Sequence, residues 1–485
     1  MMERRASQEV PVDMIENGQF LMAEEIFSER RTDDPLEMVV RSEVEMYFNR
    51  LDGAAALLEQ VAPRVTEMDV AARYSLAAGR LAIRCGDFER ANTHLQTAYY
   101  LYNFQQDPFK TSQAQLVLGN LARLLGNLED ADSKLNAAQE GIKGRTSKRS
   151  EFLRGLISSE QAALSADRGE TDQAAEHYAN AMRMLKATER GKFYARSLVG
   201  MANLKCSQGQ YQESLDLYKE ANTVFERYDV RDDLAESELE LARALIRLQR
   251  YERAERLAEE SRDLRRDSPE GESVALAVLA QLELKRNGLE EAGIHAAAAV
   301  ELADRSGSIE ARTRARIALG QVKLGEREFT QAAEALRSAA ELAAGRSADP
   351  DAALKGQIST SVLGRRLELE AIVGLGEAYH NIDTRTGRTE LARAAEILST
   401  LDDSWLTEEY NRVSAKYEEQ IVFTDDNRLV FDGNQLPKWQ EAKRTLEGFL
   451  LRNALRQTNN SLTRAARKLG VSKVHVHNLK KKHGI

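Results

Sequence analysis

The stretch LGNLARLLGNLEDADSKLNAA, residues 118–138, contains the pattern that decides the fold. At its centre lies a short phrase: a turn with Gly or a polar residue, an aromatic residue or Leu, two polar residues, and then Ala131. Leu135 and Ala138 follow four and seven positions later, a spacing that places all three on one helix face. Gly119 lies twelve positions earlier, in a second segment with helical periodicity. The stretch therefore predicts two helices joined by a tight turn.

The phrase recurs along the chain, and we call its final small residue the marker residue. Successive marker residues are separated by 31, 37, 40, 43, 40, 40, 38 and 40 residues: Ala23, Ala54, Ala91, Ala131, Ala174, Ser214, Ala254, Ala292 and Ala332. Most of them have further small residues seven positions later and twelve positions earlier. Small residues let two antiparallel helices approach closely, and the larger residue at the fourth position fills the remaining space. Since one hairpin cannot bury its apolar face alone, the repeats predict a stacked helical array.

Residues 118–138 and 319–340 resemble the core motif of the tetratricopeptide repeat, and the resemblance covers roughly residues 14–400. It implies an all-α, TPR-like α-α superhelix of about nine to ten helical hairpins. The period here is nearer 40 than the family's value of about 34, and the usual closing Pro is mostly missing. A longer-period relative of the same α-solenoid is therefore an alternative.

Arrays of this family imply a concave groove for a protein or peptide ligand, or an oligomerisation surface. A scaffold or dimerisation surface without a specific ligand is the alternative. Candidate groove positions lie on the first helix of each hairpin: Arg80, Asn120, Arg123, Asn203, Lys205 and Arg243. Nothing in one sequence separates these residues from ordinary solvated ones.

The composition changes after residue 418. The stretch IVFTDDNRLVFDGNQLP, residues 421–437, has two short β-favouring runs around a polar loop, so we expect a small hairpin or an extended linker. The predicted organisation is a tail at 1–13, the array at 14–418, the linker at 419–437 and a C-terminal module at 438–485. Residues 437–485 carry a net charge of +10, whereas the first 436 carry −19. This asymmetry indicates that the tail module, and not the acidic body, meets nucleic acid, although a solvated basic helix would have the same charge.

The module reads as three helices. Apolar residues form a helical stripe from Trp439 to Leu455, and an N-cap at Asn460 or Ser461 begins the second helix. Gly470 ends that helix, Val471 is expected to fill the core of the turn, and Ser472 caps the third. Two helices joined by a short turn with Gly predict a helix-turn-helix, whose second helix fits the major groove of DNA.

TRAARKLGVSKVHVHNLKKKHGI, residues 463–485, closely resembles the Fis-type helix-turn-helix of bacterial nucleoid proteins and enhancer-binding activators. The resemblance implies contacts with double-stranded DNA by Ser461, Thr463, Arg464, Arg467, Ser472, Lys473, His475, His477, Asn478, Lys480, Lys481 and Lys482. It also implies a homodimer whose interface contains Leu446, Phe449, Leu450 and Leu455. Each basic residue alone would equally suit a solvated surface.

Two departures from the Fis-type pattern concern specificity more than binding. Lys473 stands where the family usually has a base-reading Arg, and Lys lacks the planar fork that reads guanine through two hydrogen bonds. Leu479 and Lys480 exchange the basic and apolar positions of the family. We therefore expect DNA binding with reduced discrimination between sequences.

Other classes of protein find no support in the sequence. The chain has no apolar leader, no membrane-length apolar run and only two cysteines, which predicts a cytoplasmic, nucleoid-associated protein without a membrane partner. No G-x-x-x-x-G-K-[ST] run, metal-spaced Cys/His cluster or catalytic signature is visible. We therefore expect no enzyme activity, no catalytic residues, no metal and no cofactor.

The sequence as a whole predicts a bacterial transcriptional regulator, in which the array receives a protein or peptide signal and the module binds DNA as a dimer. Two alternatives stay open. The chain would be an interaction scaffold if the helix-turn-helix served mainly dimerisation. It would be a nucleoid-associated or RNA-binding protein if the module bound with low sequence specificity and the array had no sensing role.

Overall fold

The structure is a computed structural model, and it describes residues 11–29, 32–186, 191–345, 362–418, 422–423, 429–430, 439–458 and 460–483. The chain divides into two compact units, Met1–Val413 and Ser414–Ile485. The first unit consists of helices, and the second contains two short strands and three helices after the end of α22. Each unit is described by itself below.

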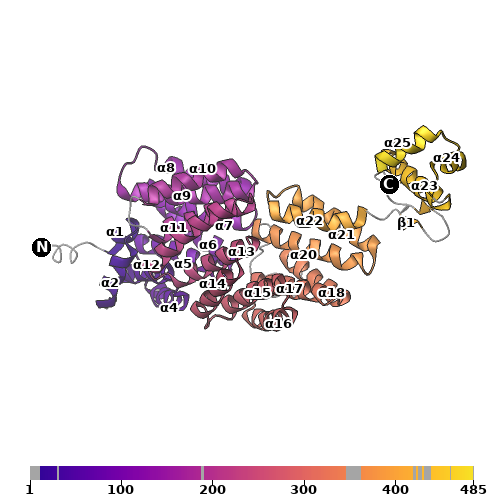
Figure 1. The fold of residues 1–485 in the computed structure, drawn as a ribbon. Helices are drawn as coiled ribbons and strands as arrows, with labels where there is room; N and C mark the ends of the chain where they lie inside the picture. The colour runs from indigo at the N-terminus through magenta and orange to yellow at the C-terminus, as the bar shows by residue number, and fades with distance from the viewer. Residues whose placement is uncertain are drawn as a thin grey trace. The chain divides into compact units, whose positions relative to one another are not determined.

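Among the described residues the first unit forms ten successive helical pairs, followed by α22 (Figure 1). The first five pairs are α1 (Pro11–Glu16) and α2 (Phe20–Glu29), α3 (Pro35–Tyr47) and α4 (Leu51–Val61), α5 (Met68–Arg84) and α6 (Phe88–Phe104), α7 (Pro108–Leu124) and α8 (Leu128–Gly141), and α9 (Lys148–Asp167) and α10 (Thr171–Lys186). A short 3₁₀ helix, Ala62–Arg64, follows α4. The next five pairs are α11 (Gly191–Ser207) and α12 (Tyr211–Arg227), α13 (Arg231–Arg247) and α14 (Tyr251–Leu264), α15 (Pro269–Lys285) and α16 (Leu289–Ser306), α17 (Ile309–Gly325) and α18 (Phe329–Ala343), and α20 (Val362–His380) and α21 (Thr384–Leu398), before α22 (Ser404–Glu418).

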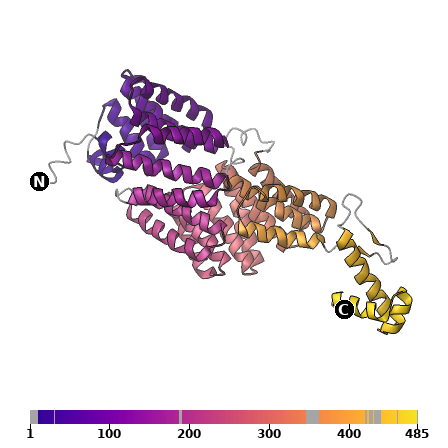
Figure 2. The ribbon, with the colours of Figure 1, turned by 90° about the horizontal axis from the view of Figure 1, so that it is seen from above.

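The pairs stack in chain order, as the colours of the array in Figures 1 and 2 show, and each helix contacts the next. The prediction of an all-α, TPR-like superhelix is therefore confirmed for this unit. One boundary differs, because α1 begins at Pro11, inside the segment expected to be a tail. Proline suits the first position of a helix, since its fixed φ is helical and its missing N–H would have no partner there.

The marker residues lie at the contact between the two helices of each pair. All nine are fully buried, with no exposed surface: Ala23, Ala54, Ala91, Ala131, Ala174, Ser214, Ala254, Ala292 and Ala332. The small and large residues predicted to face one another do so. A Cβ atom added at Gly119 would lie 2.9 Å from Cγ of Leu135, and one added at Gly79 would lie 2.6 Å from Cγ of Leu95. The two helices therefore touch through glycine and leucine, as the periodicity predicts.

The turn inside each of these pairs has a constant conformation. A residue with positive φ stands five positions before every marker residue: Gly18, Asn49, Gly86, Gly126, Gly169, Gly209, Gln249, Asn287 and Arg327. This left-handed residue ends the first helix and lets the chain reverse. Five of the nine are Gly and two are Asn, which adopt this conformation readily. Gln249 and Arg327 adopt it at an energetic cost, so at these two turns the packing imposes the geometry.

Hairpins that are distant in the sequence also meet. Glu16 on α1 pairs with Arg149 on α9 at 3.1 Å, and Nδ2 of Asn49 donates to Asp232 on α13 at 2.6 Å. Farther along, Arg365 on α20 donates to the carbonyl oxygen of Asp167 at 2.6 Å. These contacts join helical pairs that are far apart in the sequence of the first unit.

The second unit begins at Ser414, within α22, and contains a two-stranded antiparallel ribbon of β1 (Val422–Phe423) and β2 (Leu429–Val430). Val422 is paired with Val430, and Phe423 with Leu429. These strands lie in the two apolar runs for which the sequence predicts a hairpin or a linker. Three helices follow, α23 (Trp439–Gln457), α24 (Leu462–Leu469) and α25 (Lys473–His483), and each contacts the other two.

The tight contact inside a pair predicts opposite effects for two glycine substitutions. Gly79→Ala should lower the free energy of unfolding by about 1–3 kcal/mol, because the new methyl group overlaps Leu95. Gly293→Ala on α16 should raise it by about 0.5–1 kcal/mol, since its Cβ would have no neighbour closer than 3.8 Å and alanine favours the helix. Urea unfolding measures both, and equal shifts in the same direction would contradict the packing described here.

Candidate functional site

The interior of the first unit contains two neighbouring cavities. The first has a volume of about 310 Å³ and is lined by residues of α1, α2, α3, α5, α6, α7, α9 and α11. The second has a volume of about 320 Å³ and is lined mainly by α13, α15 and α17. Arg84 and Arg196 line both cavities. The inner surface predicted from the repeats is therefore hollow in this closed part of the array.

One wall of the first cavity is aromatic. Phe20 stacks on Tyr47 with ring centroids 4.3 Å apart and an angle of 8° between the planes. Phe193 on α11 lies 5.9 Å from Phe20 and 5.4 Å from Phe152 on α9. Rings brought together from four helices form a preformed apolar surface, which suits the apolar part of a ligand.

The positively charged part of the first cavity's lining comes from α5 and α11. Arg73, Arg80 and Arg84 lie seven and four positions apart, so they share one face of α5, and all three line the cavity. Lys192 and Arg196, four positions apart on α11, also line it. Arg84 and Arg196 remain exposed to solvent, whereas Arg73 and Lys192 are buried. The cavity thus presents accessible guanidinium groups close to an aromatic wall.

Lys192 joins three helices at the edge of this cavity. Its ammonium group lies 2.9 Å from Oδ2 of Asp233 on α13, and it donates to the carbonyl oxygen of Tyr47 at the end of α3. Arg196 shares the same carboxylate, with Nε donating to Oδ1 at 2.5 Å. Burial raises the pKa of Asp233, but the two cations outweigh burial and lower it to about 2. Burial and the neighbouring Arg196 lower the pKa of Lys192 to about 8, because one carboxylate serves two cations.

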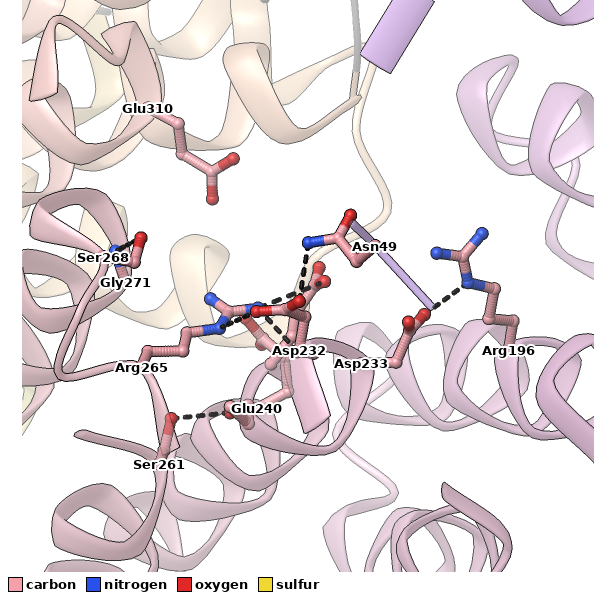
Figure 3. A network of polar contacts seen from close by, with 12 residues as sticks. Asn49, Arg196, Asp232, Asp233, Glu240, Ser261, Arg265, Ser268, Gly271 and Glu310 are labelled. Carbon is pink, nitrogen blue, oxygen red and sulfur yellow. Dashed lines mark hydrogen bonds and ion pairs between the residues drawn. The ribbon is translucent and has the colours of Figure 1, made fainter. Parts of the chain in front are cut away.

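A polar network lies in the second cavity (Figure 3). Asp232 accepts a hydrogen bond from Asn49 and lies 3.8 Å from Nε of Arg265, so the turn after α3 is tied to α13 and to the end of α14. Burial, and secondarily the charge of Glu310, raises the pKa of the Glu236 carboxyl. The lining holds carboxylates and guanidinium groups in similar number, which makes this cavity polar without a clear preference for one charge.

The six candidate groove residues predicted from the sequence do not all line a cavity. Arg80 and Asn120 line the first cavity and Arg243 lines the second. The other three have partners within the array: Arg123 pairs with Asp167 at 2.9 Å, Asn203 accepts from Tyr218 at 2.5 Å, and Lys205 donates to Gln210 at 2.8 Å. The sequence reasoning missed Arg84, Lys192 and Arg196. The sequence shows that Lys192 and Arg196 are four positions apart. It does not show that α5 and α11 line the same cavity.

The C-terminal module has its own small core, made by Leu451, Ala454, Leu455, Ala465, Ala466 and Val476. Ser461 occupies the N-cap position of α24, although its side chain makes no capping hydrogen bond. Gly470 has the left-handed conformation that ends α24, and Ser472 Oγ accepts from the N–H of His475 at the start of α25. The predicted helix, turn and helix are therefore present. Val471 does not fill the turn, because it is 37% exposed and Val476 occupies the core instead.

Most residues predicted to contact DNA are exposed. Ser461 and Lys480 are partly buried, and the remaining ten are exposed: Thr463, Arg464, Arg467, Ser472, Lys473, His475, His477, Asn478, Lys481 and Lys482. Lys482 pairs with Glu447 on α23 at 2.7 Å, so part of its charge is satisfied within the module. Hydrogen bonding from Lys482 in turn lowers the pKa of Glu447. Ten of the twelve residues are thus open to solvent, and one of these ten, Lys482, is also paired with α23.

The four residues predicted at a dimer interface do not share one environment. Leu446 and Leu450 are 40% and 45% exposed on α23, and Phe449 is partly buried. Leu455 is only 2% exposed and packs in the module's own core. Of the four, Leu446 and Leu450 in the middle of α23 are open to solvent, whereas Leu455 is not.

Val474 is a residue of α25 that the sequence analysis did not select. It is 68% exposed, the largest exposure of a large apolar side chain in the described part of this module. Val476 is fully buried and Leu479 packs against the same core, which sets the inner face of α25. Val474 lies two positions before Val476 and so points away from that face. The spacing of two from Val476 indicates that Val474 is exposed, whereas its apolar side chain alone is typical of a core residue.

The described residues contain neither a membrane-spanning helix nor a metal site of the kinds considered below. No described helix is both long and apolar enough to cross a membrane. In the same part of the chain, no group of three or more His, Cys, Asp or Glu side chains is arranged to hold a metal ion.

Comparison with known proteins agrees with the repeat architecture. A tetratricopeptide repeat profile matches residues 193–267, which span α11 to α14 apart from the first residues of α11. Among curated proteins none matches the sequence. The chain is thus shown to contain tetratricopeptide repeat sequence within a TPR-like helical solenoid.

One solved structure shares the fold at low sequence identity, and two others are similar with TM-scores under 0.5. The apo form of the quorum sensor NprR from B. thuringiensis is 15% identical, with a TM-score of 0.51 over 75% of this chain and 97% of that one. A Rap protein complexed with competence and sporulation factor is 15% identical, with a TM-score of 0.48 over 73% and 100%. A STAND signal-transduction ATPase with a tetratricopeptide repeat sensor, from Pyrococcus horikoshii, is 16% identical, with a TM-score of 0.49 over 66% and 52%.

The lowered pKa of Lys192 predicts a pH dependence of stability. Between about pH 8 and the ordinary value near 10.4, the unfolded chain binds a proton that the folded chain lacks. The free energy of unfolding should therefore rise with pH in this window, by at most about 1.4 kcal/mol per pH unit. Lys192→Met should abolish this contribution. Urea unfolding of both proteins from pH 7 to about 10 measures it, and identical slopes would contradict the assignment.

Proposed function

We propose that this chain is a bacterial transcription regulator that binds DNA through α24 and α25 and receives a protein or peptide ligand through the array. One observation carries the DNA-binding part of the proposal: the helix-turn-helix exposes a surface rich in Lys and Arg. Residues 437–485 have twelve basic and two acidic side chains, and one of those acids, Glu447, already pairs with Lys482. The Fis-type resemblance of residues 463–485 supports the same reading.

The N-terminal end of α25 has the properties of a base-reading segment. Lys473, Val474 and His477 are exposed, and Val474 faces away from the core. Lysine donates to guanine O6 and N7, and an apolar side chain contacts the methyl group of thymine. Arg464, Arg467 and Lys481 would add attraction to phosphates that is independent of sequence. The module thus combines the two kinds of contact that a site-specific protein needs.

The array supports the ligand-receiving half of the proposal. It is a TPR-like solenoid, which favours a regulatory or protein-interaction role, and its inner surface has two cavities in the closed part. The fold resembles that of NprR, which is described as a quorum sensor. The first cavity combines aromatic with charged groups, as binding sites do.

Substitution in the module tests DNA binding. Lys473→Gln should lower affinity for a preferred duplex by about 1–3 kcal/mol and relax discrimination at one base pair. Lys481→Gln should weaken binding to all duplexes alike and reduce the salt slope by about one unit. Lys443→Gln, on exposed α23 outside the predicted surface, is the matched control. Selection from genomic fragments with the full-length protein, followed by fluorescence anisotropy across a salt series, supplies the measurement.

The outcomes separate the alternatives. Palindromic sites that are lost in Lys473→Gln support a site-specific regulator. Strong, salt-dependent binding without a preferred site supports a nucleoid-associated protein of low specificity. Absence of salt-sensitive binding by the full-length protein would overturn the proposal and favour an interaction scaffold whose helix-turn-helix serves dimerisation.

The predicted homodimer is tested by the exposed apolar residues of α23. The double substitution Leu446→Glu and Leu450→Glu should convert the dimer to a monomer, because it places two like charges on each side of the interface. Val474→Glu changes an exposed apolar residue of α25 and should leave the dimer intact. Sedimentation velocity measures the mass of each. A dimer that survives the double substitution would place the interface elsewhere.

A further inference from the structure

The first cavity holds more positive charge than its own carboxylates can neutralise. Arg80 lies 3.4 Å from Glu43, which is also bound by Arg73 at 2.7 Å. Arg196 shares Asp233 with Lys192. Within the described residues, no carboxylate lies within ion-pair distance of Arg84, whose guanidinium donates instead to the side-chain oxygen of Asn49.

The remaining carboxylates of the lining are occupied by other groups. Glu16 is 5% exposed and pairs with Arg73 and Arg149. Glu160 accepts from Asn120 at 2.9 Å and lies 3.4 Å from Arg123. The lining therefore has five cations against three carboxylates, and two of these carboxylates, Glu16 and Glu160, also pair with cations outside the cavity. Two of the five cations, Arg84 and Arg196, line the second cavity as well, where carboxylates are present. Burial, and next the charge of Arg196, lower the pKa of Arg84, while carboxylates of the second cavity act in the opposite direction.

Three of the five cations are more exposed to solvent than the other two. Arg84 is exposed, the Arg196 side chain is 43% exposed and the Arg80 side chain is 32% exposed, although all three line an interior cavity. These three side chains are thus more accessible to a ligand than those of Arg73 and Lys192, which are buried. Arginine presents parallel N–H groups that match a carboxylate through two hydrogen bonds.

Most of the remaining lining is apolar, with the rings of Phe20, Phe152 and Phe193 beside Ile83 and Val117. A ligand must therefore offer an apolar body as well as an anion. Glu43 and Glu160 line the same cavity, which favours a single negative charge over a phosphate dianion. A volume of about 310 Å³ lies at the small end of the range for small-molecule sites, so the body is compact.

We infer that this cavity binds a compact amphipathic carboxylate, with the anion held by Arg80, Arg84 and Arg196 and the apolar body against the aromatic wall. The inference rests on the ligand-receiving half of the proposed function and names the chemistry of that ligand. It is independent of DNA binding by the module. The carboxylate belongs either to a free organic acid or to the C-terminus of a peptide, and the experiment separates these two sources.

Isothermal titration of the full-length protein with four probes tests the inference. The probes are 3-phenylpropanoate, its neutral amide, and N-acetyl-Leu-Phe with a free carboxylate or as the C-terminal amide. Both carboxylates should bind, and each amide should bind at least about tenfold more weakly, the scale of a lost charged hydrogen bond. Tighter binding of the dipeptide carboxylate identifies a peptide terminus, and tighter binding of 3-phenylpropanoate identifies a free acid.

Substitutions of lining residues test whether the carboxylate binds in this cavity. Arg84→Gln and Arg80→Gln should each weaken carboxylate binding about tenfold and leave the amides unchanged. Arg90→Gln is the control, since Arg90 is exposed on α6 and does not line the cavity. Circular dichroism checks that each variant is folded. The inference is overturned if neither carboxylate binds, if amides bind equally well, or if both cavity variants bind like the parent protein. Anisotropy with DNA on the same samples shows whether the regulatory proposal stands when this inference fails.

Discussion

The close approach of two helices within each pair is the constraint on which the rest of the array depends. Gly79 and Gly119 allow Leu95 and Leu135 to lie against the backbone of the facing helix, where a single methyl group would collide. Each marker residue is consequently buried completely. Because every pair has the same internal spacing, successive pairs stack in a regular way, and the inner surface is formed from the first helices. The cavities exist because this stacking continues until distant hairpins meet.

The meeting of distant hairpins depends on polar contacts around Lys192. Its ammonium group connects the end of α3 with Asp233 on α13, and Asn49 adds a second connection to Asp232. Burying an ammonium group beside two guanidinium groups has an unfavourable electrostatic cost, which the lowered pKa of Lys192 records. Such a cost is tolerated where a polar cluster fixes a unique arrangement or leaves positive charge available to a ligand. The first cavity has both features.

Sequence periodicity predicted contacts between neighbours in the chain but not contacts across the closed array. The marker residues, their small partners and the end of α24 at Gly470 followed from local spacing, and the structure has them as expected. The cationic side of the first cavity was found only in part, because Arg80 was named while Arg84 and Arg196 were not. No spacing in one sequence shows that α5 and α11 face a common space. In the module, the same limit explains Val471, whose hydrophobicity suggested burial although Val476 already fills the core.

The left-handed residue lies five positions before each marker residue, so this spacing is constant, whereas the spacing between successive marker residues varies. Inside a pair, the distance from the turn to the buried contact never varies over the nine turns. Between pairs, the steps range from 31 to 43 residues. The variation therefore falls between one marker residue and the next turn, in the lengths of the helices and of the links between pairs. The inner surface can thus differ in width and chemistry from pair to pair while the turn and the buried contact beside it keep one geometry.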